Sequence, residues 1–178
     1  DVDVSTDEDT PISFTLSADE FDGDSYSFGI ISNPSNGTAA LSGNNVLYTP
    51  NANWNGTDTF TFEAVDDRMG LNNKSINIGT ANITVNPIND PPVSEEVSVS
   101  VVENTAVLVT MNASDIESNT LTYLISAQPS NGILGGVAGS QVLYTPNANY
   151  IGSDSFIYKV NDGTDAVSYT HLRAHETQ

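Results

Sequence analysis

The sequence predicts an all-β protein of two tandem Greek-key β-sandwich domains, the second of which lacks its last strand. Three observations indicate this fold class. The eight residues VLYTPNAN occur at 46–53 and again at 142–149. Alternating runs rich in β-branched and aromatic residues recur along the chain, as in FTFEAV at 60–65 and FIYKV at 156–160. Clusters of turn-forming residues separate these runs at intervals of about ten residues, which is typical of a β-sandwich.

The repeat defines the domain size. Ser35–Gly37 correspond to Ser130–Gly132 at a separation of 95, and Leu47–Pro50 correspond to Leu143–Pro146 at a separation of 96. A unit of about 95 residues is much longer than a solenoid repeat and has the size of a small independent domain. We therefore expect each copy to bury its own core.

The first copy contains seven expected strands. We place them near residues 2–5, 11–17, 25–31, 38–41, 45–48, 58–65 and 76–86. Pro50 is expected to end its strand, because proline cannot donate to a β-ladder. Trp54 and Tyr150 hold the same place in the two copies, and we interpret both rings as core packing at one end of the sandwich.

The chain divides at the proline-rich sequence VNPINDPPVS. We predict a first domain at 1–88, a short linker at 89–92, a truncated second domain at 93–166 and a non-native tail at 167–178. Val167–Thr177 resembles the translation of a sequencing-library adapter. We therefore do not interpret His171 and His175 as a pair of metal ligands.

Composition restricts the possible partners. Four basic residues against 23 acidic residues give a net charge of −19, which disfavours nucleic acid and anionic membrane surfaces. No apolar run is long enough for membrane insertion. Cysteine is absent from the sequence, so any bound metal must have oxygen ligands. The charge itself favours cations as partners.

The acidic residues gather in three places in the first copy. These are Asp7–Asp9, the segment with Asp19, Glu20, Asp22 and Asp24, and the pair Asp66 and Asp67. The second copy keeps a thinned version, in which Glu103 matches Glu8, Asp115 and Glu117 match Glu20 and Asp22, and Asp162 matches Asp66. Calcium takes six to eight hard oxygen ligands, many from Asp and Glu, and these clusters offer them.

Several motifs together resemble the cadherin-like, immunoglobulin-like tandem repeats of large bacterial adhesins. The motifs are VVENT at 101, VDD at 65, PINDPP at 87 and DIE at 115, together with LYTPNAN and NDG. The resemblance covers residues 1 to about 166. It implies calcium at the junction of successive domains. The implied ligands here are Glu8, Asp66, Asp67, Asn89, Asp90, Asp115 and Glu117.

A second group of acids forms weaker candidates for metal ligands. Glu20, Asp22 and Asp24 are expected to face a preceding domain. Glu103 and Asp162 are the counterparts of Glu8 and Asp66 in the second copy. The alternative is an acidic surface without an ordered ion.

The sequence is best interpreted as a calcium-stiffened structural repeat of an extracellular adhesin, a spacer whose partners are neighbouring repeats. One alternative is an adhesive module that binds a cell-surface glycan or protein. Another is an accessory domain of a secreted hydrolase. No catalytic motif such as G-x-S-x-G or a P-loop occurs, and we expect no enzyme activity.

Overall fold

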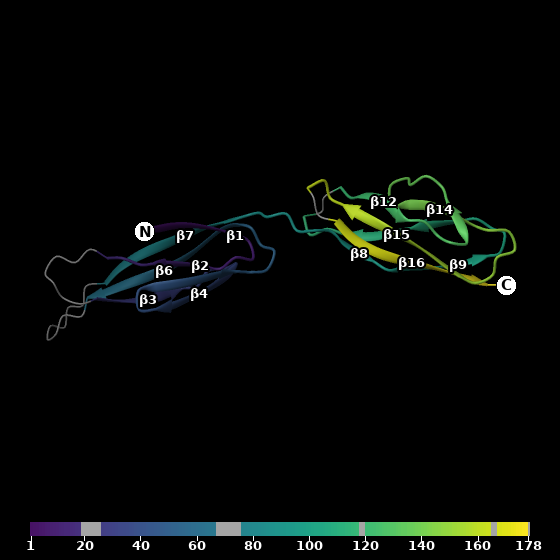
Figure 1. The fold of residues 1–178 in the computed structure, drawn as a ribbon. Coiled ribbons are helices and arrows are strands. Elements are labelled where there is room, and N and C mark those ends of the chain that lie inside the picture. The colour runs from purple at the N-terminus through teal and green to yellow at the C-terminus, as the bar shows by residue number, and fades with distance from the viewer. Residues whose placement is uncertain (19–25, 67–75, 118–119, 165–166, 178) are drawn as a thin grey trace. The chain divides into compact units, whose positions relative to one another are not determined.

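The computed structural model describes residues 1–18, 26–66, 76–117, 120–164 and 167–177, and every strand or turn discussed below lies within these ranges. The chain forms two compact units, Asp1–Ile88 and Asn89–Gln178. All regular elements of the described residues are β-strands (Figure 1). Within the described part of the chain we find no helix with the length and apolar character needed to cross a membrane. The predicted all-β class and its tandem sandwiches are confirmed.

The first unit is a sandwich of two sheets. Its strands are β1 (Val2–Asp7), β2 (Ile12–Thr15), β3 (Tyr26–Ser32), β4 (Gly37–Ser42), β5 (Asn45–Pro50), β6 (Gly56–Asp66) and β7 (Ile76–Asn86). One sheet has the order β1-β7-β6-β3 and the other β2-β5-β4. The β1 and β7 strands run parallel, and the other neighbours are antiparallel. All seven strands expected from the sequence are present.

Alternation along each strand fills the space between the sheets. In β5, Val46, Tyr48 and Pro50 are buried while the residues between them are more exposed, as a period of two requires. Phe60 and Phe62 face the same core from β6, together with Ile83 from β7. Trp54 packs against this cluster, so its predicted role in core packing is confirmed.

The second unit repeats this arrangement. Its strands are β8 (Val93–Glu95), β9 (Val97–Val102), β10 (Val107–Thr110), β11 (Asn112–Ser114), β12 (Thr122–Ala127), β13 (Gly132–Leu134), β14 (Gln141–Pro146), β15 (Ser153–Asn161) and β16 (Val167–Thr177). The sheets have the orders β12-β15-β16-β9 and β10-β14-β13, and β8 and β11 form a small additional pair. The burial pattern of β14 is the same as that of β5.

The prediction that the second sandwich lacks its closing strand is wrong. The adapter-like residues form β16, which pairs antiparallel with β15 and parallel with β9. This register repeats that of β7 between β6 and β1 in the first unit. A β-ladder is built from main-chain N–H and C=O groups, which every residue except proline carries in full, so a segment of foreign style can still pair.

Candidate functional site

Two linker residues are bound by carboxylates of the second unit. The Asn89 side chain donates from Nδ2 to Asp162 Oδ2 at 2.7 Å. The Asp90 main-chain N–H donates to Glu117 Oε1 at 3.3 Å. Asn89 and Asp90 therefore belong structurally to the second unit, where acids from two different loops hold them.

The turn after β15 positions Asp162. Asn161 Oδ1 accepts the Gly163 N–H at 2.8 Å, and Asp162 Oδ1 accepts the Thr164 N–H at 2.7 Å. Gly163 has a φ of 98°, which glycine adopts without a Cβ penalty. The NDG motif thus fixes the buried Asp162 carboxylate at the end of β15, with Oδ2 available to Asn89.

Hydrogen bonding keeps Asp162 charged. The Asn89 side chain and then the Thr164 N–H hold the pKa of the Asp162 carboxyl below its ordinary value of 3.8, although burial acts in the opposite direction. Both hydrogen bonds stabilise the carboxylate more than the acid. The group is therefore an anion at neutral pH.

Asp115 brings another carboxylate to the same end of the unit. It follows directly after β11, whose last residue Ser114 pairs with Val93 at the start of β8. The side chain is half-buried, and its Oδ2 atom is buried and receives no hydrogen bond. Asn89, Asp90, Asp115, Glu117 and Asp162 thus lie around the start of the second unit. We call these five residues the linker cluster.

Glu8 has a structural role at the end of the first unit. It is buried, and its Oε1 accepts the Ile88 N–H at 2.6 Å while its own N–H donates to Asn86 O at 2.9 Å. These two bonds fix the chain directly before the linker cluster begins.

Glu8 and Asp66 cannot contact one ion, so their assignment to a single site is wrong. Glu8 lies beside Asn86, and the adjoining Val85 pairs with Gly56 at the start of β6. Asp66 ends the same strand and pairs with Tyr26. Ten residues of extended chain separate the two ends of β6, which is about 34 Å. The resemblance supplied the residue types, but strand direction decides which end of the sandwich each one occupies.

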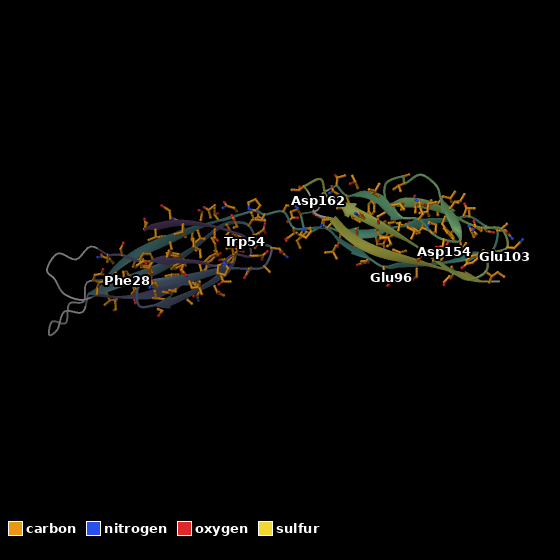
Figure 2. All side chains as sticks on the ribbon, viewed as in Figure 1. Phe28, Trp54, Glu96, Glu103, Asp154 and Asp162 are labelled. Carbon is orange, nitrogen blue, oxygen red and sulfur yellow. The ribbon has the colours of Figure 1, made fainter. Side chains whose placement is uncertain are left out.

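The weaker candidates separate in the same way. Figure 2 shows Glu103 and Asp162 at opposite ends of the second unit, with Glu103 far from the linker cluster. Asp66 belongs with the first unit's other end by its pairing with Tyr26. Asp67 and the candidates Glu20, Asp22 and Asp24 lie outside the described residues. In the described ranges, no three His, Cys, Asp or Glu side chains are arranged closely enough to hold a metal ion.

Two buried carboxylates that the sequence did not single out each accept four hydrogen bonds. The buried Asp58 accepts the N–H groups of Ser35, Asn36 and Thr59 and the hydroxyl of Tyr48, all at 2.9–3.0 Å. The buried Asp154 accepts the equivalent groups of Ser130, Asn131, Ser155 and Tyr144 at 2.8–2.9 Å. We call these two sets the carboxylate staples.

The carboxylate staples explain why the two copies share their letters. PSNG supplies two of the three donating main-chain groups, and VLYTPNAN supplies the tyrosine. TDTF or SDSF supplies the acid and the third main-chain donor. Each staple ties two consecutive strands to a turn that lies 22 to 24 residues before the acid. The repetition of Asp58 and Asp154 beside the same motif was the signal that could have identified them.

Comparison with protein families agrees with this architecture. The family model described as "Bacterial Ig domain" matches residues 1–85 and 89–172. The chain belongs to the bacterial Ig domain family. The resemblance noted in the sequence is thereby confirmed, and the second match of this bacterial Ig domain pair extends into β16.

Solved structures show the same fold at low sequence identity. The human CDH23 EC21-23 structure is 13% identical, with a TM-score of 0.58 over 98% of this chain and 72% of that chain. The protocadherin GammaB4 extracellular domain is 13% identical, with a TM-score of 0.50 over 98% of this chain and 33% of that chain.

The endo-fucoidan hydrolase MfFcnA4 from glycoside hydrolase family 107 is 18% identical, with a TM-score of 0.40 over 99% of this chain and 28% of that chain. The chain thus spans less than a third of that hydrolase. No curated protein matches the sequence.

Proposed function

We propose that this pair of bacterial Ig domains is a calcium-stiffened structural repeat of an extracellular surface protein or secreted adhesin, acting as a spacer. One observation carries the proposal: where the first unit ends and the linker begins, three consecutive residues each meet a carboxylate of their own unit. The pairs are Ile88 with Glu8, Asn89 with Asp162, and Asp90 with Glu117. A flexible tether would not need such anchors.

The linker cluster contains the oxygen donors that calcium requires, and calcium would draw together side chains that do not yet form a metal site among the described residues. Asp90, Asp115, Glu117 and Asp162 offer carboxylate oxygens, and Asn89 offers an amide oxygen once its side chain turns. Bound calcium would supply positive charge that offsets the repulsion among these acids in a chain of net charge −19. That Glu8 adds a further ligand stays a prediction.

Calcium would act on the linker more than on either core. The ligands hold Asn89 and Asp90 to loops of the second unit, whereas each core consists of apolar side chains between two sheets. Binding to the folded state would therefore restrict the linker and add only the stability given by mass action. The proposed function is to make the linker rigid, and it involves no chemical reaction.

A calcium titration of the full chain tests the binding site. Isothermal titration calorimetry of Asp162→Asn and Glu117→Gln should show calcium affinity reduced by about tenfold or more, because each loses a charged ligand. Glu103→Gln is the matched control, since Glu103 lies at the other end of the same unit. Equal affinity in all three variants would contradict the assignment.

Small-angle scattering tests the mechanical role. Adding a chelator should broaden the distribution of inter-unit distances while far-UV circular dichroism stays unchanged. Identical scattering profiles with and without calcium would end the spacer proposal even if calorimetry detected an ion.

A further inference from the structure

The single Asp–Pro bond of the sequence lies in the linker, between Asp90 and Pro91. The nitrogen of an X–Pro bond belongs to a tertiary amide and carries no hydrogen. Aspartate on the other side of the bond brings a carboxylate that can reach its own main-chain carbonyl carbon by closing a small ring. The Asp90 side chain can therefore act as an internal nucleophile toward the bond that follows it.

A side-chain amide already contacts the carbonyl oxygen of this bond. Asn89 Nδ2 donates to Asp90 O at 3.2 Å. The same nitrogen donates to Asp162 Oδ2 at 2.7 Å, and an amide nitrogen has two hydrogens, so both bonds can form together. A donor at a carbonyl oxygen stabilises the negative charge that develops there when a nucleophile adds to the carbonyl carbon.

The second unit holds these groups in place. The carboxylate that orients Asn89 belongs to Asp162, which is itself buried. The Asp90 N–H donates to Glu117 Oε1 at 3.3 Å, which restrains the residue on the amino side of the bond. Asn89 and Asp90 are half-buried, whereas Pro91 is exposed. The carbonyl is thus restrained while the proline is open to water.

We propose that the Asp90–Pro91 bond is an intramolecular cleavage site at which the chain cuts itself once. An Asp90 carboxylate oxygen adds to the Asp90 carbonyl carbon, and the Asn89 amide stabilises the resulting oxyanion. The C–N bond to Pro91 then breaks, its electron pair stays with nitrogen, and that nitrogen takes a proton from water.

A cyclic anhydride remains on Asp90 after this step. The hydroxide left by the water opens the anhydride and gives Asp90 a second carboxyl group. The net reaction is the hydrolysis of one peptide bond, and it needs no oxidant, reductant or cofactor. Because the chain is its own substrate and reacts once, this is not enzyme activity toward another molecule.

The cut would separate the two sandwiches. The first product would retain β1–β7, and the second would begin at Pro91 and retain β8–β16. Each apolar core lies within one product, so we expect both products to stay folded. The linker would thus be a place of release as well as a connection. This inference goes beyond the spacer role and does not depend on calcium.

Denaturing mass spectrometry of the full chain tests the cut. The purified chain is incubated at neutral pH with a chelator, so that no metal ion can occupy the Asp90 carboxylate. Two fragments should accumulate, and the second should begin with PPVSE. The rate should not depend on protein concentration, because the reaction is intramolecular. A rate that rose with concentration or fell with protease inhibitors would overturn the proposal.

Asp90→Glu is the matched control for the nucleophile. It keeps the negative charge and the main-chain N–H that Glu117 accepts, but its carboxylate reaches the carbonyl carbon only through a larger ring. Cleavage before Pro91 should slow by about tenfold or more. An original chain that gave no more fragment than Asp90→Glu would overturn the proposal.

Asn89→Ala tests the contact with the carbonyl oxygen. It removes the donor at Asp90 O, so cleavage should slow by about tenfold or more. If Asn89 merely held the linker in place, its loss would free the bond and leave cleavage unchanged or faster. Asn86→Ala is the control, because Asn86 Nδ2 donates to Asp7, and it should cleave at the original rate. Equal rates in Asn89→Ala and the original chain would overturn the assigned role of Asn89.

Discussion

The two units agree inside and differ at their edges. Their carboxylate staples have the same hydrogen bonds. Their buried positions keep the same character, since Leu16 is equivalent to Met111 and Phe62 is equivalent to Tyr158. The outer faces differ, since the exposed Leu108 of β10 stands where β2 has Ser13. A sandwich therefore requires its core pattern and its turn anchors, whereas the exposed surface and the edge strands can change from one domain to the next.

Of the changes considered, removing a carboxylate staple should reduce the free energy of unfolding of a unit the most. Asp58→Ala leaves three main-chain N–H groups and the Tyr48 hydroxyl without their acceptor in a buried place. We expect a loss of about 3–5 kcal/mol in the free energy of unfolding of the first unit. Urea titration followed by Trp54 fluorescence measures it.

Asp154→Ala is the matched control for the same measurement. Asp154 lies in the other unit, so the Trp54 transition should stay unchanged while a second transition in circular dichroism moves by a similar amount. If the two variants moved the same transition, the units would not unfold independently.

The strands could be predicted from sequence because their signal is local. Alternation within each run decides the buried face, and the seven expected strands of the first unit are all present. The staples could not be predicted in this way, because Asp58 meets donors 22 and 23 residues earlier in the chain. Only the closed fold brings those groups together.

The joint assignment of Glu8 and Asp66 to one metal site failed for a related reason. Glu8 and Asp66 carry suitable oxygens, but the sequence does not say which end of β6 each approaches, and the strand register places them at opposite ends. Asn89, Asp90, Asp115 and Glu117 lie near the start of the second unit, because the linker and the loop after β11 both adjoin β8, and their role as metal ligands stays a prediction. Asp162 joins them through its hydrogen bond to Asn89.

Removing the tyrosine hydroxyl should have a smaller effect than removing the acid. Tyr48→Phe leaves Asp58 with its three main-chain donors, and Tyr144→Phe does the same for Asp154. Each should reduce the free energy of unfolding of its own unit by about 1–2 kcal/mol. Urea titration of both variants checks whether the two losses are equal. A loss in one unit only would show that the staples match in geometry but not in energy.

The same Tyr48 hydroxyl should make the stability of the first unit depend on alkaline pH. Burial, followed by the hydrogen bond to Asp58 and the charge of that carboxylate, raises the pKa of Tyr48 above its ordinary value of 10.0. The folded state therefore favours the protonated phenol, and this contribution is complete below pH 10 and is lost as the pH rises above it. The urea midpoint reported by Trp54 should fall above pH 10 in the original chain and fall less in Tyr48→Phe. An equal fall in both would assign the alkaline loss to other groups.

The smallest expected effect comes from making the two turns alike. Asp9 and Asn104 both have left-handed backbones, with φ of 57° and 58°, and each accepts the N–H of the last residue of the NAN turn, Asn53 or Asn149, at 2.9 Å. Asp9→Asn keeps this acceptor, suits a left-handed position and removes one negative charge from an acidic chain. It also adds a donor like Asn104 Nδ2, which reaches Asn149 Oδ1 at 3.2 Å.

We expect the first unit to gain up to about 0.5 kcal/mol, measured by the Trp54 urea midpoint, while Asn104→Asp should weaken the second unit by a similar amount. A loss in both variants would mean that each turn is adjusted to its own residue and that the two copies have diverged even where their geometry agrees.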